Sequence, residues 1–268
     1  MKLFEELKSI IATLRSEDGC PWDREQTHQS LKSNLLEETY EIIEAIESND
    51  SAKICEELGD LLSVIMLQAR IGQESGNFDI EQVLEKISEK LIRRHPHVFS
   101  DLSVKNTNQV IQNWEKIKLS EEGYQDRDSA LDGVPIALPS LQRAEKLQTK
   151  AARVGFDWDN VTEVLPKLKE EIEEIEACLI DGPIDQVEME VGDLLFSVVN
   201  LARFLNVEAE SALRKSNQKF ESRFHQMEAH VSACGHELTD YSLEQLDQIW
   251  EMVKSDKLLP IQQRIEEK

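Results

Sequence analysis

The same acidic pattern occurs twice in this 268-residue sequence, and the duplication constrains the fold more than any other feature. A Glu-Glu-x-x-Glu segment precedes a Glu-x-x-Asp segment once in the first half and once within Lys167–Arg203. Glu57 follows Glu38 by 19 residues, and their later counterparts are separated by the same 19 residues. Further downstream two pairs recur in order: Lys90 and Arg94 match Lys219 and Arg223, and Trp114 and Lys118 match Trp250 and Lys254. Features that recur in order indicate an internal repeat, so we expect two tandem domains of one fold.

The periodic segments of the sequence have the spacing of α-helices. Apolar residues recur at three- and four-residue intervals, as in residues 3–15, and strand-like alternation is absent. Gly and Pro are few, and the charged residues are mostly Glu and Lys, which favours helix. We therefore predict an all-α protein with helical-bundle domains over residues 1–120 and 141–268 and a linker over 121–140. We expect the first acidic helix to begin near Thr27.

The acidic segments predict a metal site on a helical hairpin. Side chains three residues apart share one face of a helix, so Glu171 pairs with Glu174 and Glu190 pairs with Asp193. A turn around Gly182 would fold the two helices together and bring the four carboxylates into one place. Ligands that are all oxygen favour a hard cation, Mg²⁺ or Mn²⁺. A possible second set lies in the first half: Glu38, Glu41, Glu57 and Asp60.

The second helix of the later hairpin is apolar over most of its surface, which predicts burial on nearly all sides. One polar stripe nevertheless runs along it, at Glu190, Asp193, Ser197 and Asn200. Buried carboxylates are costly unless they are paired or bound to metal. In the first half, Val64 and Leu67 replace the last two stripe residues. Because each half exposes a helix of the buried type, we expect a second copy to cover it, in a homodimer.

Basic and aromatic residues downstream suit a phosphorylated ligand. Lys219 and Arg223 lie one helical turn apart and can hold phosphates, while Trp250 beside Lys254 can stack on a nucleobase. Mg²⁺ bound by carboxylates usually takes further ligands from a substrate phosphate. The sequence contains no P-loop, GxSxG, HExxH or GxGxxG motif, which leaves metal-assisted attack of water on phosphorus.

The same residues are compatible with two other classes of function. A di-iron carboxylate bundle normally needs Glu-x-x-His on two helices, and only Glu25 and His28 have that spacing, with no repeat in the second half. A non-catalytic helical scaffold that senses nucleotides would show the same pattern without turnover.

Composition excludes several partners. The formal net charge of −23 argues against binding to nucleic acid or to an anionic membrane surface. The four cysteines lie far apart without a CxxC pair, which predicts neither a zinc site nor a disulfide framework and fits a reducing cytoplasm. The N-terminal residues have the pattern of an amphipathic helix rather than a signal peptide, and the longest apolar runs are too short or too polar to cross a bilayer. We therefore expect a cytoplasmic protein.

At these motifs the sequence closely resembles the MazG family of nucleoside triphosphate pyrophosphohydrolases. The resemblance covers nearly the whole chain, and its most specific segments are Gly19–Asp23, Leu36–Glu41, Gly59–Leu62, Arg93–Phe99 and Val154–Trp158. It implies the all-α NTP pyrophosphatase fold, a dimer, and Mg²⁺-dependent conversion of an NTP or dNTP and water to the monophosphate and pyrophosphate. Broad tolerance of the base is also implied.

The resemblance further assigns roles to individual residues. The carboxylates that would bind Mg²⁺ and serve catalysis are Glu171, Glu174, Glu190 and Asp193. The residues that would bind substrate are Lys167, Lys219, Arg223, Trp250 and Lys254. In relatives with two repeats the second is the main catalytic unit, and the loss of the polar stripe at Val64 and Leu67 agrees with this. The N-terminal repeat is therefore predicted to be weak or regulatory.

Overall fold

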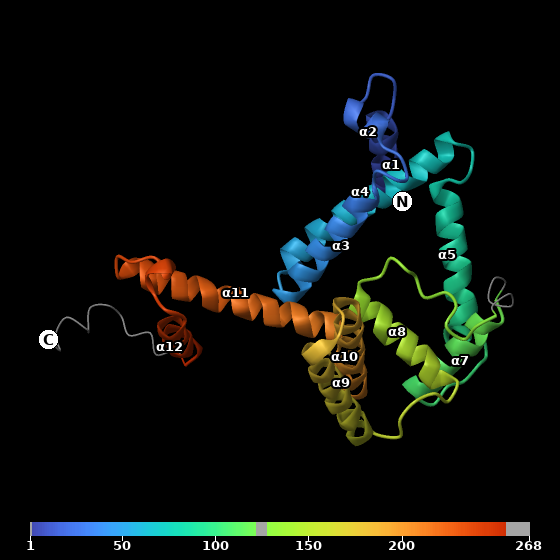
Figure 1. The fold of residues 1–268 in the computed structure, drawn as a ribbon. Helices are drawn as coiled ribbons and strands as arrows, with labels where there is room; N and C mark the ends of the chain where they lie inside the picture. The colour runs from blue at the N-terminus through green and yellow to red at the C-terminus, as the bar shows by residue number, and fades with distance from the viewer. Residues whose placement is uncertain (1, 122–127, 256–268) are drawn as a thin grey trace. The chain divides into compact units, whose positions relative to one another are not determined.

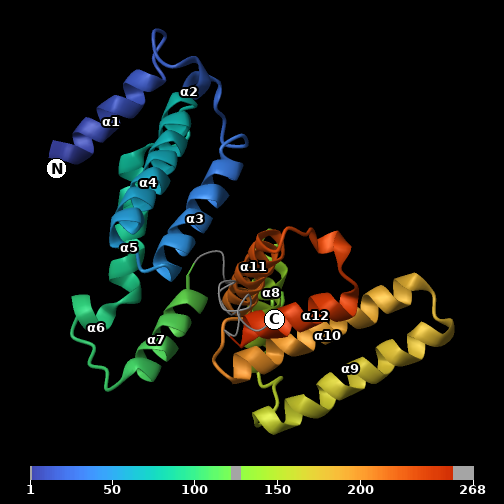
Figure 2. The ribbon, with the colours of Figure 1, turned by 90° about the vertical axis from the view of Figure 1, so that its left-hand side faces the viewer.

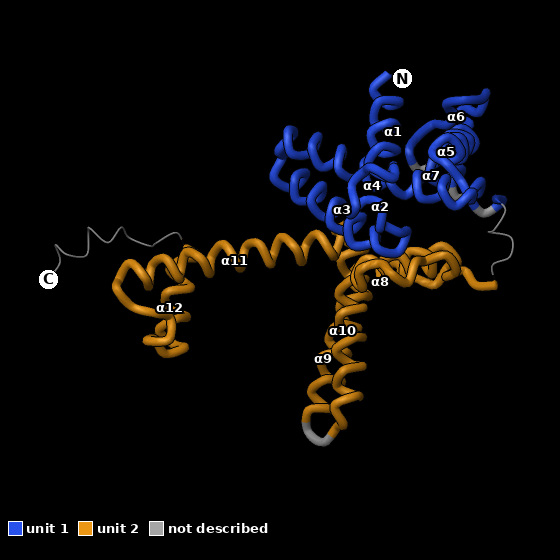
Figure 3. The backbone as a smooth tube through the Cα atoms, turned by 90° about the horizontal axis from the view of Figure 1, so that it is seen from above, with its two compact units in different colours: residues 1–126 blue, residues 127–268 orange. Residues whose placement is uncertain are grey.

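The computed structural model describes residues 2–121 and 128–255, and within these ranges every regular element is a helix (Figure 1). The predicted all-α fold is confirmed. The chain divides into two compact units, residues 1–126 and 127–268 (Figure 3). Of the predicted linker, residues 122–127 lie outside the described residues, and residues 128–139 form turns. None of the helices in the described ranges has the length and hydropathy needed to span a bilayer.

The N-terminal unit is built around a helical hairpin. Its helices are α1 (Lys2–Leu14), α2 (Pro21–Glu25), α3 (Lys32–Glu47), α4 (Ser51–Glu74), α5 (Ile80–Arg94), α6 (Pro96–Phe99) and α7 (Thr107–Leu119). Helices α3 and α4 lie side by side (Figure 2). The turn between them places Asn49 at φ 56°, and the Asp50 side chain caps α4 by accepting hydrogen bonds from the backbone N–H groups of Ala52 and Lys53.

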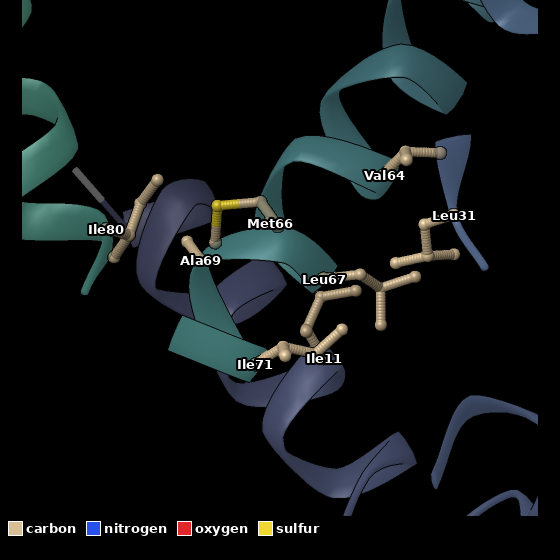
Figure 4. Packing of buried hydrophobic residues seen from close by; sticks show 8 residues of the cluster. All are labelled: Ile11, Leu31, Val64, Met66, Leu67, Ala69, Ile71 and Ile80. Carbon is tan, nitrogen blue, oxygen red and sulfur yellow. The ribbon is translucent and has the colours of Figure 1, made fainter. Parts of the chain in front are cut away.

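Helix α3 begins at Lys32 and not near Thr27, where its start was predicted. The Thr27 N–H donates to Ser30 Oγ at 2.9 Å, and the Ser30 N–H donates to Thr27 Oγ1 at 3.1 Å. This reciprocal pair stabilises a turn before the helix, as short hydroxyl side chains often do. Leu31 ends the turn fully buried in the core between α1 and α4 (Figure 4).

The C-terminal unit repeats this plan. Its helices are α8 (Ser140–Arg153), α9 (Val161–Asp181), α10 (Ile184–Phe204), α11 (Ala209–Ala233) and α12 (Leu243–Lys254), with a short 3₁₀ helix at Leu238–Asp240. Helices α9 and α10 form the second hairpin, joined at Gly182 and Pro183 (Figure 2). Helix α8 packs on α10 as α1 packs on α4. Helix α11 starts beside α8 and α10, with Ala209 packed against Ala144 and Val199, and pairs with α12 further along.

The apolar surface of α10 is only partly covered within one chain. Leu195 is 51% exposed, Phe196 44% and Val198 46%, whereas Val199 is buried. The prediction that this helix is buried on nearly all sides is therefore wrong for the single chain. Helices α8 and α9 cover part of its circumference, and the side chains that point away from both face solvent. The equivalent helix α4 has the same property at Leu58 and Leu62.

Candidate metal and nucleotide site

Three carboxylates gather on the α9–α10 hairpin. Oxygen atoms of Glu171, Glu174 and Glu190 all lie within 4.8 Å of one another. Glu171 is 3% exposed, Glu190 is half-buried and Glu174 is exposed. Glu171 and Glu174 project from one face of α9 because they are three residues apart, and the antiparallel return of the chain places Glu190 opposite them. The structure thus brings together three of the four carboxylates predicted for this site.

Asp193 is the fourth predicted ligand, and it does not belong to this group. Its side chain is exposed one turn further along α10. The i, i+3 spacing puts Asp193 on the same side of α10 as Glu190. Which carboxylates come within reach of one another depends on how α9 packs on α10, and this packing brings Glu190 but not Asp193 to the acids of α9. Its role as a metal ligand stays a prediction.

One lysine compensates part of the charge of this group. Lys167 Nζ lies 2.9 Å from Oε1 of Glu171 and 2.9 Å from Oε1 of Glu170. These carboxylates raise the pKa of the Lys167 ammonium. Desolvation raises the pKa of Glu174, and a hydrogen bond to Glu171 and the charge of Glu190 add to the shift, against the opposing effect of Lys167. Carboxylates this close repel one another, so a bound cation would stabilise the group.

The donor atoms of this group fit a hard divalent cation. All are carboxylate oxygens, the ligands that Mg²⁺ and Mn²⁺ prefer. A di-iron centre would need histidine beside these acids. The only histidine with the right sequence spacing, His28, instead contacts the Gln68 side chain and stacks on Phe78 at 5.8 Å between ring centroids. The side chains therefore favour Mg²⁺ or Mn²⁺ over iron.

The N-terminal unit holds a matching group on α3 and α4. Oxygen atoms of Glu38, Glu41 and Glu57 also lie within 4.8 Å of one another, and Glu57 is buried. Desolvation raises the pKa of Glu57, and a hydrogen bond to Glu41 adds to this shift. Desolvation also raises the pKa of Glu38, followed by the charge of Asp60. Asp60 itself is exposed and lies outside the group, as Asp193 does in the other unit.

The two units differ beyond the acids. In α10 the polar stripe continues through Ser197 and Asn200, which are 7% and 4% exposed. The Asn200 Oδ1 accepts hydrogen bonds from Arg203 at 3.0 and 2.7 Å, and Arg203 also pairs with Asp157. In α4 the equivalent position, Leu67, is packed in the hydrophobic core (Figure 4).

A cavity of about 300 Å³ opens beside this end of the stripe. Phe156, Trp158 and Phe196 provide aromatic walls, and Asn200 and Arg203 lie at its lining. Gln148, another lining residue, donates a hydrogen bond to the Phe196 carbonyl at 2.8 Å. Sequence reasoning did not identify Gln148 or Arg203 as residues of a site. The only signal for Arg203 was the Ala-Arg dipeptide that occurs in the second helix of both hairpins, and Gln148 had none.

The predicted phosphate and base contacts lie on α11 and α12. Lys219 is exposed and Arg223 is half-buried, and no described residue forms an ion pair with either of them. Trp250 packs against Phe220 at 5.3 Å between ring centroids, and Lys254 pairs with Glu251 at 2.6 Å. The core cluster of α11 and α12 contains no residue of α9 or α10. Among the described residues, no ion pair or hydrogen bond connects these four side chains to the acidic group.

An all-α chain with a group of three carboxylates on each of two helical hairpins has side chains suited to a helical carboxylate metal site. Comparison with known proteins narrows this description. A family model described as the MazG nucleotide pyrophosphohydrolase domain matches residues 26–99 and 160–227, once in each repeat. The chain belongs to the MazG family.

Full-length relatives agree with this assignment. The nucleoside triphosphate pyrophosphohydrolase of Escherichia coli strain K12 is 44% identical over 261 residues, which cover 96% of this chain and 99% of that protein. The nucleoside triphosphate pyrophosphohydrolase/pyrophosphatase MazG of Thermotoga maritima is 45% identical over 252 residues, covering 94% and 96%. A crystal structure of a mazG-related protein from Thermotoga maritima aligns with 42% of this chain and 97% of its own, at 31% identity and a TM-score of 0.38.

Proposed function

We propose that this protein is a Mg²⁺-dependent nucleoside triphosphate pyrophosphohydrolase. It converts an NTP or dNTP and water to the monophosphate and pyrophosphate, with little selection among bases. The observation that carries the proposal is the group of Glu171, Glu174 and Glu190 in a chain of the MazG family. The names of the two full-length relatives describe the same reaction.

The acidic group supplies the place where the reaction occurs. Glu171, Glu174 and Glu190 would hold Mg²⁺, and Asp193 would complete the set once the cation draws it in. A bound Mg²⁺ supplies Lewis-acid activation of water and neutralises charge on the phosphates. Lys167 balances Glu171 from its position at 2.9 Å, and its flexible side chain can turn toward a substrate phosphate.

Substrate binding falls to the basic and aromatic residues. Lys219 and Arg223 would bind phosphate oxygens, to which arginine can donate two parallel hydrogen bonds. Trp250 and Lys254 would contact the nucleoside part. Stacking on an aromatic ring discriminates little between bases, because every base offers a π face. Broad base tolerance follows from this mode of contact.

A homodimer would complete the site. The α9–α10 hairpin exposes Leu195, Phe196 and Val198, and the α11–α12 residues lie in a separate cluster of the same chain. A second copy packed on the hairpin would bury the apolar face and can bring basic residues to the acids. Sedimentation analysis of the protein and of Leu195→Glu tests this: the native chain should be a dimer, and the charge on α10 should weaken it. A native chain that sediments as a monomer would contradict the dimer.

The two repeats would contribute unequally to catalysis. The C-terminal unit has the polar stripe, and Lys219 and Arg223 form no ion pair among the described residues, so we assign catalysis to this unit. We assign a weak or regulatory role to Glu38, Glu41, Glu57 and Asp60. The reaction is expected in a reducing cytoplasm, in keeping with four cysteines that form no disulfide.

The direct test incubates the purified protein with each NTP and dNTP and separates the products. Monophosphate and pyrophosphate are expected with Mg²⁺, and none after removal of the metal by EDTA. Diphosphate and orthophosphate would refute the proposed bond cleavage. Absence of turnover with any metal would favour the nucleotide-sensing scaffold, and activity that requires iron would favour the di-iron centre.

A further inference from the structure

A glutamate of the N-terminal unit is held by two neighbouring arginines. Glu121 Oε1 accepts hydrogen bonds from Arg93 Nε at 3.0 Å, from Arg93 Nη2 at 2.9 Å and from Arg94 Nε at 3.0 Å. Its Oε2 lies 2.5 Å from Arg94 Nη2. The side chains of Glu121 and Arg94 are only 10% and 13% exposed. A carboxylate that takes four charge-assisted hydrogen bonds is bound as a tightly held anion.

Arg94 is the N-terminal counterpart of Arg223. Both end a Lys-x-x-x-Arg segment, and both segments lie on the helix that follows the acidic hairpin. The tryptophan counterparts also agree: the Arg94 guanidinium lies 5.0 Å from the centre of the Trp114 ring, on helix α7, which packs against α5 as α12 packs against α11. If Arg223 binds a phosphate, as proposed above, the same position in the N-terminal repeat is already taken by Glu121.

The described part of the C-terminal repeat shows no such occupant. Among the described residues no carboxylate pairs with Arg223. Glu121 follows Trp114 by seven residues, and the residue that follows Trp250 by seven is Lys257, which lies outside the described residues. A carboxylate at this place is thus a feature of the N-terminal sequence alone.

We propose that Glu121 stands in for a phosphate group at Arg93 and Arg94 and keeps the N-terminal repeat from binding a nucleoside triphosphate. The proposal rests on the proposed function for the role of Arg223. It explains how a repeat can retain its acidic group and its Lys-x-x-x-Arg segment and still bind substrate weakly. Replacing the carboxylate by a neutral group is expected to open a second anion site per chain.

The test measures anion binding by calorimetry on the full chain, with Mg²⁺ and inorganic tripolyphosphate as the probe. Glu121→Gln keeps the size of the side chain and removes its charge, and Glu121→Ser is a second variant in case the first does not fold. Either folded variant should bind one more tripolyphosphate per chain than the native protein, or bind it at least about 10-fold more tightly. The native number of sites and affinity in both folded variants would overturn the proposal.

Two controls separate this effect from a general change of charge. Glu74→Gln removes another carboxylate held by two arginines in the same unit, Arg15 and Arg70, and should leave binding unchanged. Adding Arg94→Ala to Glu121→Gln should abolish the new site, and its persistence would overturn the role of Arg94. Tripolyphosphate binding does not require turnover. A native protein that hydrolyses no NTP would therefore contradict the proposed function, while the difference in tripolyphosphate binding between the native protein and the Glu121 variants would still test the role of Glu121.

Discussion

Helices α4 and α10 start alike and then diverge. Each carries the Glu-x-x-Asp segment, and each contributes one glutamate, Glu57 or Glu190, to a group of three carboxylates. Two turns later α4 buries Val64 and Leu67 in its core, whereas α10 presents Ser197 and Asn200. Both halves therefore keep the acidic group, but only the C-terminal half continues it as a polar stripe.

The helices that follow the two hairpins also differ, in the availability of their arginines. In the N-terminal unit the arginine at the end of α5 is neutralised by Glu121, while in the C-terminal unit Arg223 has no ion-pair partner among the described residues. Both differences favour substrate binding in the C-terminal repeat. A group of carboxylates suited to metal binding is therefore insufficient evidence of a working site. The polar and basic residues around it must also be able to contact a substrate.

The largest expected effect separates the two acidic groups. Glu174→Gln should lower the rate of NTP hydrolysis by about 10²–10³-fold, since it removes one preorganised charged group at the reacting centre. Glu41→Gln, the same change in the other repeat, should leave most of the activity. Glu173→Gln, an exposed neighbour outside the group, is the matched control. Steady-state rates of NTP hydrolysis are measured for all three variants. Equal losses of activity from Glu174→Gln and Glu41→Gln would contradict the proposed difference between the two repeats.

Making α4 resemble α10 should destabilise the N-terminal unit. Leu67→Asn puts an amide into the core position of a side chain that is 6% exposed, where Arg70, the counterpart of Arg203, already pairs with Glu74. The loss of apolar burial and the unsatisfied amide should cost about 3 kcal/mol. Leu62→Asn, on the same helix but 39% exposed, should cost far less. Urea unfolding gives both values, and similar losses would show that the core of α4 tolerates the polar stripe.

The Glu121 contact should make the stability of the N-terminal unit depend on pH. The Arg94 and Arg93 guanidinium groups hold the pKa of Glu121 at about 2, below its ordinary value of 4.5. A lowered pKa stabilises the folded state above about pH 4.5, and this stabilisation is lost as the pH falls toward 2. The native protein should exceed Glu121→Gln in unfolding free energy by about 2 kcal/mol at pH 6, and the difference should shrink toward zero at low pH. A difference that does not change with pH would contradict the ion pair.

The reverse exchange should have the smallest effect on stability. Asn200→Leu removes the hydrogen bonds from Arg203, but Arg203 keeps its ion pair with Asp157. The expected change in unfolding free energy is about 1 kcal/mol or less. Denaturant unfolding followed by circular dichroism measures it. A loss as large as that from Leu67→Asn would mean that the polar stripe of α10 mainly supports the fold.

Much of the site could be read from local spacing. The i, i+3 pairs placed Glu171 with Glu174 on one helix face, and the predicted turn around Gly182 placed Glu190 on the returning helix. Spacing alone also included Asp193 in the group, which the packing of α10 leaves exposed. The start of α3 was missed because two hydroxyl side chains, Thr27 and Ser30, hold a turn before it.

The sequence by itself determined the helical class, the duplication and the position of each acid along its helix, because helical periodicity and internal repeats are local properties. Only the tertiary structure decided which acids meet, that Gln148 and Arg203 line a cavity, and that Glu121 occupies the arginines at the end of α5. These contacts join residues up to dozens of positions apart. They depend on how helices pack, which follows from the fit of whole side-chain surfaces and leaves no fixed spacing in the sequence.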